Sequence, residues 1–481
     1  MKQLTAVLVV LGLSITMGQT AARVEADPPE PPVPVAPSVG VPGVPGVPGV
    51  PNPFQQWIDD HVPAPTKVVP HAARPLAAPG DLPPELTAFW SAVQSPPTGD
   101  PLFDAWPADL AEYAPGDILD ARDVTESARP TMLLLNLTGI SRATLLKFRT
   151  TNSAGEPSIG TATLVLPPKA WSGPGPQPVL VNAPATNSLN KRCTPGYVLS
   201  HGMEVPTGND FTPSPTTWAL DHGYALIIPD HEGPLMAYSE PSVAGRNVLD
   251  SMRAVRHFAP DQFGESRFAT TGYSGGAIAS NAAAMLVSDY APELLPQFAG
   301  ASFGGLVNDY RRFAHTFDGS YISAFLLSTV LAVGREHPEI LGLMNHAAQW
   351  LATSPIKDNC SGSFGALGIA PIPIDTMARV DKSLDSAAAE TLFQELSMQG
   401  RKSGVPLFIY HGISDPWIPV AEAEQLWSEQ CALGVAATKN IVGGEHLAAY
   451  VSSYGATMDW LDQRLRGEPA TGTCPAPPAR R

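Results

Sequence analysis

Charged side chains, and cations above all, are scarce in this chain. Of its 481 residues only 15% are charged, and 45 Asp and Glu outnumber 29 Lys and Arg, which gives a formal net charge of −16. Such a charge repels a polyanion, so nucleic acid is excluded as a partner, and attraction to an anionic membrane is disfavoured. Beyond the N-terminal segment, no apolar run reaches the length of a transmembrane helix.

Cysteine is equally scarce. The four cysteines are Cys193, Cys360, Cys431 and Cys474. None belongs to a CxxC or CxxH pattern, so we expect no zinc site and no other metal centre. In an exported protein an even number of cysteines indicates two disulfides, and four cysteines allow three pairings.

The N-terminus has the features of an export signal. Lys2 supplies a positive charge, Leu4 to Met17 is mostly apolar, and Val24-Glu25-Ala26 offers a small-residue cleavage site. We therefore expect residues 1–26 to be a cleaved signal peptide and the protein to be secreted or associated with the cell envelope. A membrane anchor is the alternative, but the apolar run is short for a comfortable span.

Residues 27–53 are dominated by Pro, Val and Gly, and Val41 to Pro51 repeats Val-Pro-Gly. Proline removes hydrogen-bond donors, and glycine raises the entropic cost of ordering the chain. We expect this segment to be an extended or flexible linker that acts as a passive spacer, rather than a wall-binding or protein-binding module.

Short apolar runs alternate with helical segments in the remainder of the chain. This alternation predicts an α/β fold, and continuous apolar runs indicate a mostly parallel sheet that helices cover on both faces. The strand-like runs are Thr144–Thr150, Ile159–Leu166, Pro178–Asn182, Tyr224–Pro229, Arg267–Tyr273 and Val405–His411, and the helical segments include Pro84–Gln94, Val243–Phe258 and Ala277–Val287.

Residues 306–400 interrupt that pattern, because they are rich in Ala and Leu and have few strand signals. Tyr321–Val333 and Ile340–Leu351 are predicted to be helical. We expect a helical insertion that divides the α/β domain into residues 54–305 and 401–481. An insertion at this place can cover an active site, although helices that simply pack on the sheet explain the pattern nearly as well.

The motif Gly272-Tyr273-Ser274-Gly275-Gly276 carries the chemistry. A GxSxG sequence alone is a weak signal in a chain with 42 glycines, but here a β-prone run precedes it and a small-residue helix follows. That setting predicts a sharp turn that exposes Ser274 as a nucleophile. The backbone N–H of Gly275, at the start of the helix, then points at a developing oxyanion.

A serine hydroxyl needs a base to take its proton, and in this arrangement the acid and then the histidine follow the serine. Of the five histidines downstream, we choose His446, which lies in a loop before a helical segment. His315, His337 and His346 fall in the predicted insertion, and His411 is expected to shape the loop that carries the acid.

The acid is expected on a loop after the next-to-last strand, and Asp415 occupies that position. It would hold the His446 imidazole in the productive tautomer. An Asx turn before Pro416 is the purely structural alternative for Asp415. Glu445 is the competing acid, although its adjacency to His446 gives poor geometry.

A second oxyanion donor should come from the loop after Pro178–Asn182. The candidates there are Ala185 and Thr186, and no glycine-rich motif singles out either of them.

Four short motifs follow one another along the chain. They are Gly223-Tyr224 with Asp230-His231-Glu232-Gly233, Tyr273-Ser274-Gly275-Gly276-Ala277, Tyr290-Ala291-Pro292-Glu293-Leu294, and Gly412 to Pro419 with Glu445-His446. Together they resemble the secretory lipase family typified by lipase A of Candida antarctica, a family of the α/β-hydrolase superfamily with many actinobacterial members.

The resemblance implies an α/β-hydrolase core, a helical lid inserted after the nucleophile, and a triad of Ser274, Asp415 and His446. It also implies hydrolysis of triacylglycerol or related esters without a cofactor. The family's disulfides would pair Cys193 with Cys360 and Cys431 with Cys474.

One departure concerns the oxyanion hole, where family members carry an aspartate or a glycine-rich loop. The matching stretch here is Ala183-Pro184-Ala185-Thr186-Asn187. No aspartate is available, so an amide near Ala185 or Thr186, or the Thr186 hydroxyl, is expected to take its place.

These features predict a secreted triacylglycerol lipase that acts through an acyl-enzyme. Its partner is an acylglycerol or other ester substrate at a lipid–water interface, and no obligate protein partner is implied. The alternatives are a short-chain carboxylesterase or acyltransferase of the same fold and, from another class, a catalytically weak or inactive envelope-associated binding protein.

Overall fold

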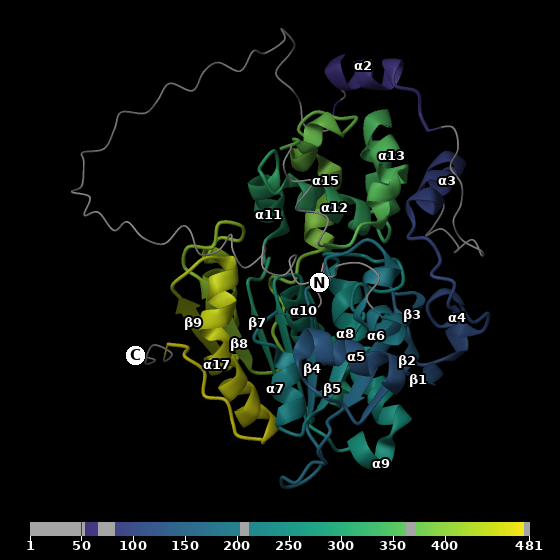
Figure 1. The fold of residues 1–481 in the computed structure, drawn as a ribbon. Helices are drawn as coiled ribbons and strands as arrows, with labels where there is room; N and C mark the ends of the chain where they lie inside the picture. The colour runs from purple at the N-terminus through teal and green to yellow at the C-terminus, as the bar shows by residue number, and fades with distance from the viewer. Residues whose placement is uncertain (1–49, 51–52, 66–81, 203–210, 362–370, 476–481) are drawn as a thin grey trace, which may run out of the picture. The chain divides into compact units, whose positions relative to one another are not determined.

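The computed structural model describes residue 50 and residues 53–65, 82–202, 211–361 and 371–475 (Figure 1). The predicted signal peptide, residues 1–26, lies outside the described residues, as does nearly all of the predicted linker, residues 27–53. Within the described part, no helix is both long and apolar enough to cross a membrane.

A nine-stranded sheet forms the centre of the described residues. Its strand order is β1-β2-β3-β5-β4-β6-β7-β8-β9. The first three pairings, from β1 to β5, are antiparallel, and the five from β5 to β9 are parallel. The strands are β1 Ile118–Asp123, β2 Arg142–Thr151, β3 Pro157–Leu166, β4 Val179–Ala183, β5 Ala225–Pro229, β6 Phe268–Tyr273, β7 Phe298–Gly304, β8 Leu407–Gly412 and β9 Ala437–Val442.

Helices cover both faces of this sheet, so its central strands are buried throughout. One cluster of buried side chains joins the sheet to α8 (Pro241–Phe258), α10 (Gly275–Tyr290) and α16 (Ala421–Ala432). A second cluster joins the opposite face to α5 (Thr125–Asn136), α6 (Pro195–His201), α7 (Pro215–Asp221) and α17 (His446–Leu465). The expected α/β class with a mostly parallel sheet is therefore confirmed.

The chain between β7 and β8 is helical. Its helices gather at the upper end of the sheet in Figure 1, and they contribute to two further apolar clusters, one of which they share with α3. They are α11 Tyr310–Phe317, α12 Ser323–Val333, α13 His346–Thr353 and α15 Ala387–Glu395, with the short turns η4 Pro338–Leu343, η5 Pro355–Asp358, η6 Ile374–Thr376 and η7 Ser383–Asp385. We call residues 305–406 the insertion.

The single helix predicted over Ile340–Leu351 is divided in two. The turn η4 ends at Leu343, Met344 forms a β-bridge with Ala378, and α13 begins only at His346. The side chain of Asn345 accepts the Ala348 amide and so caps α13. An asparagine at this position favours a new helix start over continuation of the preceding turn.

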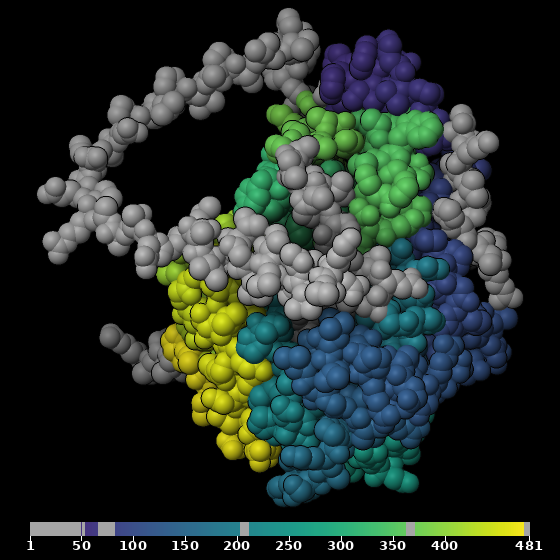
Figure 2. All heavy atoms as spheres, viewed as in Figure 1, coloured from purple at the N-terminus to yellow at the C-terminus, as the bar shows by residue number. Residues whose placement is uncertain are grey.

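Two N-terminal helices pack on the insertion. Helix α3 (Pro84–Val93) contacts η4 and α13, and α2 (Pro53–His61) contacts α13, where it appears as the purple segment against green helices in Figure 2. The Asp59 carboxylate accepts the His346 amide at 2.7 Å, next to the start of α13. The remaining short elements are α4 Pro101–Asp104, α9 Pro260–Phe263, η1 Leu110–Glu112, η2 Lys191–Cys193 and η3 Pro292–Leu294.

Two disulfides link segments that are distant in sequence. Cys193 is bonded to Cys360 across 167 residues, and Cys431 is bonded to Cys474 across 43 residues. Of the three possible pairings, this is the one that the family resemblance implies. The first bond ties the segment after β4 to the insertion, and the second ties α16 to the chain that follows α17.

Candidate active site

Ser274 lies at the sharp turn between β6 and α10. Its φ of 55° is a left-handed conformation that costs energy for a residue with a side chain. The turn depends on two neighbouring glycines: a Cβ on Gly272 would lie 2.1 Å from the Gly276 carbonyl oxygen, and a Cβ on Gly276 would lie 2.0 Å from the Ala183 carbonyl oxygen. The motif thus holds the serine at the C-terminal edge of the parallel strands, where ligands bind in open α/β sheets.

Asp415 and His446 follow the C-terminal ends of two further strands, β8 and β9. The Asp415 Oδ2 lies 2.5 Å from His446 Nδ1, and Asp415 Oδ1 accepts the backbone amides of Trp417 at 2.9 Å and Ile418 at 3.0 Å. Both side chains are almost fully buried. Burial alone would raise the pKa of Asp415, but the imidazole and the two amides outweigh it and lower that pKa below its usual value.

The other imidazole nitrogen of His446 is free. Nε2 is buried and has no hydrogen-bond partner among the described residues. The ring is held between two aromatic side chains, with ring centroids 4.8 Å from Trp417 and 5.1 Å from Tyr273, and the Tyr273 hydroxyl donates to the His446 carbonyl. Because the ring is fixed and Nδ1 is engaged by a carboxylate, Nε2 is the atom left to accept a proton.

Ser274 and His446 line the same cavity, which has a volume of about 200 Å³. Trp417 and Ile418, from the loop that carries the acid, also line it. The insertion contributes five apolar residues to the remaining wall: Val307, Phe313, Phe317, Ile322 and Phe325. The structure therefore brings the predicted nucleophile and base to one apolar cavity, with the predicted acid behind the base.

The predicted oxyanion residues differ in their placement. Gly275 and Ala185 line the cavity, and Gly275 is the first residue of α10, where backbone amides face outward and the helix dipole favours negative charge. Thr186 is absent from the cavity wall, and its amide donates to the Pro184 carbonyl at 2.9 Å. This hydrogen bond favours the Ala185 amide over the Thr186 amide as the backbone donor.

Asn187 is a residue that sequence reasoning missed, because the candidates considered in that stretch were an aspartate, the backbone amides near Ala185 and Thr186, and the Thr186 hydroxyl. It lines the cavity, has a left-handed φ of 44°, and its buried Oδ1 has no hydrogen-bond partner among the described residues. A Cβ on Gly275 would lie 1.7 Å from that oxygen, so the side chain packs directly against the start of α10. Oxygen and nitrogen of an amide exchange by a half-turn, so the same pose presents either a donor or an acceptor.

Comparisons with known proteins agree with this geometry. The secretory lipase family profile matches residues 215–473, which is more than half of the chain. The chain belongs to the secretory lipase family. Lipase 10 of Candida albicans is 27% identical over 79% of this chain and 83% of its own length, and a probable trichothecene esterase of Stachybotrys chartarum is 28% identical over 76% of each.

Among solved structures, lipase A of Candida antarctica in its closed state superposes with a TM-score of 0.69 at 26% identity, covering 79% of this chain and 89% of that one. These similarities confirm the family, the α/β-hydrolase type of fold and the class of enzyme. The chain is a carboxylic ester hydrolase.

The other candidate residues of this secretory lipase have different partners. His315 lies 3.4 Å from Asp385, and His346 lies 2.7 Å from the Val62 carbonyl oxygen. His411 Nε2 lies 2.8 Å from the Ile418 carbonyl oxygen and 3.4 Å from Asp415, so it supports the acid's loop as expected. The Glu445 carboxylate accepts the first amides of α17, as a helix cap.

One group of side chains in the described residues could ligate a metal ion. His337, Glu339 and Glu395 offer three ligand atoms within 4.8 Å of one another. Both glutamates are exposed, and the imidazole already forms ion pairs with them, at 3.8 Å to Glu339 and 3.2 Å to Glu395. The group lies in the insertion, and none of its members lines the Ser274 cavity.

Proposed function

We propose that this secretory lipase hydrolyses acylglycerols by acyl transfer to Ser274, with His446 as the general base and Asp415 as the residue that orients it. One observation supports this most strongly: His446 has a carboxylate on Nδ1 and an unpaired Nε2, and it lines the same cavity as Ser274. That is the arrangement a serine nucleophile needs.

The reaction proceeds in two steps. Nε2 of His446 takes the Ser274 proton as the hydroxyl oxygen attacks the ester carbonyl, and the resulting imidazolium protonates the departing alcohol. A water molecule then attacks the acyl-enzyme, with His446 again as base, which releases the fatty acid and restores the serine. Asp415 stays ionised throughout, and its lowered pKa keeps it so at neutral pH.

Negative charge on the tetrahedral intermediate is stabilised by three groups around Ser274. The Gly275 amide at the start of α10 is the first, and the Ala185 amide is the second. We add the side-chain amide of Asn187 as the third, because it lines the same cavity and lies against Gly275. Preorganised donors of this kind contribute most where water is excluded.

The acyl chain is accommodated by the insertion. A second cavity, of about 190 Å³, lies within the insertion, and its wall is almost entirely apolar. Phe313 contributes to the walls of both this cavity and the Ser274 cavity. Apolar walls on this scale favour a substrate with an alkyl chain over a small polar ester.

Export through residues 1–26 is part of the proposal. Two supports exist: the family is one of secretory lipases, and the chain contains two disulfides, which persist in oxidising compartments.

The test is hydrolysis of p-nitrophenyl esters by Ser274→Ala, with circular dichroism to verify folding. We expect kcat to fall by about 10⁵-fold or more, and retention of wild-type activity would contradict the proposal. A chain-length series then separates lipase from esterase, since a relative at 28% identity is named as an esterase. A sharp optimum at acetate or butyrate would make this chain a short-chain carboxylesterase.

A further inference from the structure

The loop that follows β4 has to hold a strained conformation. Residues 184–189 carry Ala185 and Asn187 to the Ser274 cavity, and Asn187 is in the left-handed region. A short loop in such a conformation persists only where its surroundings hold it in place. The segment Asp230-His231-Glu232-Gly233, which sequence comparison singles out without giving it a role, lies beside this loop.

Two side chains of that segment bind the loop backbone. The Glu232 carboxylate accepts the Ser188 amide at 3.3 Å and also accepts the amide of Asn187. His231 Nε2 lies 2.8 Å from the Pro184 carbonyl oxygen. Burial lowers the pKa of His231 to about 4, so its ring is neutral at physiological pH, and the carbonyl partner requires the proton on Nε2.

From the other side, Arg335 of the insertion supports the same loop. Its guanidinium is fully buried and donates to the carbonyl oxygen of Leu189 at 2.8 Å. It also donates to three carbonyl oxygens outside the loop, those of Val93, Leu235 and Lys357. The Asp358 carboxylate is the main group whose charge offsets that of Arg335.

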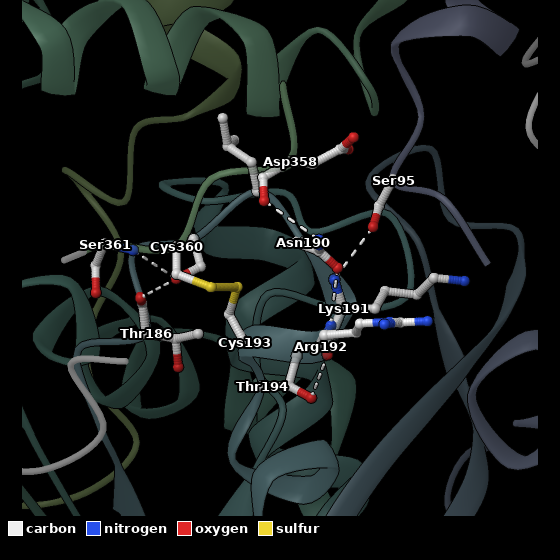
Figure 3. The surroundings of a disulfide bond; sticks show 12 residues. Ser95, Thr186, Asn190, Lys191, Arg192, Cys193, Thr194, Asp358, Cys360 and Ser361 are labelled. Carbon is white, nitrogen blue, oxygen red and sulfur yellow. Dashed lines mark hydrogen bonds between the residues drawn. A yellow bond between two sulfur atoms is a disulfide. The ribbon is translucent and has the colours of Figure 1, made fainter. Parts of the chain in front are cut away.

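The disulfide region completes the tie to the insertion. Ser188 Oγ donates to the Thr186 carbonyl at 2.6 Å and accepts the Ser361 amide at 3.1 Å. Figure 3 shows Thr186 and Ser361 next to the Cys193–Cys360 bond. The Asn190 side chain donates to the Asp358 carbonyl oxygen in the same view. The loop is thus held between the end of β5 and the insertion.

We propose that Glu232 is a positioning residue for oxyanion stabilisation, which fixes the Asn187 side chain beside Gly275 by accepting the Asn187 and Ser188 amides. This inference rests on the proposed function of Asn187. Arg335 then connects the same loop to the insertion, so displacement of the insertion would also shift the loop that carries Asn187. Glu232 itself does not line the cavity.

The chain offers a matched control for a merely structural role. Asp230 belongs to the same segment and is equally buried, but its carboxylate accepts the Gly196 amide at 2.8 Å and the Thr161 hydroxyl at 2.5 Å. Neither partner belongs to the loop of residues 184–189. If only the loss of a buried carboxylate matters, substitutions of Asp230 and of Glu232 should have the same effect on kcat. If the position of the loop matters, only the substitution of Glu232 should lower kcat.

The experiment compares Glu232→Gln, Asp230→Asn, Asn187→Ala and the double variant of residues 187 and 232 on p-nitrophenyl butyrate. Active-site titration with a fluorophosphonate counts the folded molecules in each preparation. We expect Asn187→Ala to lower kcat by about 100-fold and Glu232→Gln by about 10-fold, with KM within about twofold. Asp230→Asn should keep the kcat of the wild type even where it lowers the Tm.

The double variant is decisive. If Glu232 acts through Asn187, the double variant has the kcat of Asn187→Ala alone, because the second change has nothing left to displace. Multiplicative losses, or an unchanged kcat in Glu232→Gln, would overturn the inference. The proposed function fails differently, since it fails only if Ser274→Ala remains active.

Discussion

The sheet and the insertion make different contributions to one cavity. The sheet positions four polar residues, each of which follows one of its strands: Ser274, Asp415, His446 and Asn187. Asp415 and His446 are hydrogen-bonded to each other, Ser274 and Asn187 have left-handed backbone conformations, and the Asn187 amide is also hydrogen-bonded. The insertion contributes mainly apolar side chains around the serine, such as Phe317 and Phe325. In the proposed mechanism, the sheet edge therefore provides the catalytic groups and the insertion determines the shape of the substrate site.

The largest effect should come from the sheet edge. Asp415→Asn leaves the shape intact but no longer selects the imidazole tautomer, so kcat should fall by about 10⁴-fold. The matched control is Glu445→Gln, which should lose only stability, since Glu445 caps α17. Steady-state kinetics of both variants check this. A comparable loss of kcat in Glu445→Gln would contradict the assignment of Asp415 as the acid.

The covalent link between the two regions should matter next. Cys193 and Cys360 join the segment after β4 to the insertion, whereas Cys431 and Cys474 join α16 to the chain that follows α17. Replacing either pair by serine should cost about 3–5 kcal/mol of stability. Only the first replacement should also lower kcat/KM, by about tenfold through a displaced loop. Equal kcat/KM values for the two variants, measured well below their Tm, would remove this distinction.

Substitutions within the insertion should change the selectivity for acyl-chain length without removing the catalytic activity. Phe317→Ala or Phe325→Ala should change the laurate-to-butyrate ratio of kcat/KM by about tenfold, because differences of a few methylenes are recognised by wall contacts. The control is Phe89→Ala, since Phe89 is buried beneath the insertion but lines neither cavity. If Phe317→Ala and Phe325→Ala both keep the wild-type ratio, as the control should, the result would contradict the role of the insertion.

The smallest effect is on stability, and it again belongs to the sheet region. Burial raises the pKa of Asp230 to about 7 and that of Glu232 to about 8. The folded state then binds more protons than the unfolded state between their ordinary and raised pKa values, so stability falls as the pH rises through this range. Buried His231 and His411, whose pKa values are lowered, oppose this only below about pH 6.5.

We therefore expect the Tm to decrease from pH 6.5 to pH 8, and Asp230→Asn to reduce that decrease. Differential scanning calorimetry at the two pH values measures it. An identical decrease in the wild type and in Asp230→Asn would show that Asp230 does not titrate in this window.

The regular parts of the fold were predictable, because their signals are local. The runs that became β4, β5, β6 and β8 are continuous and apolar, and each strand is buried along its length. By contrast, β7 contains four consecutive small residues, 299–302, and ends at Gly304, and β9 is an edge strand with Lys439 and Asn440 partly exposed. Neither strand has a strong pattern.

The site divides in the same way. Ser274 could be predicted from the turn chemistry around it. Asp415 could be predicted from its place after an apolar run, and His446 from chain order and from the loop before a helical segment. Asn187 could not, since its placement depends on Glu232, Ser361 and Arg335, which are distant in sequence and meet the loop only in the folded chain. A rule that accepted any amide or acid side chain in that loop would have found it.

The central claim is that Ser274 is made nucleophilic by a histidine that Asp415 orients. Fluorophosphonate labelling followed by mass spectrometry of the modified peptide tests it most directly. We predict rapid labelling on Ser274 alone in the wild type, no labelling in Ser274→Ala, and strongly slowed labelling in Asp415→Asn. Labelling on another serine, or an equal rate in Asp415→Asn, would contradict the account.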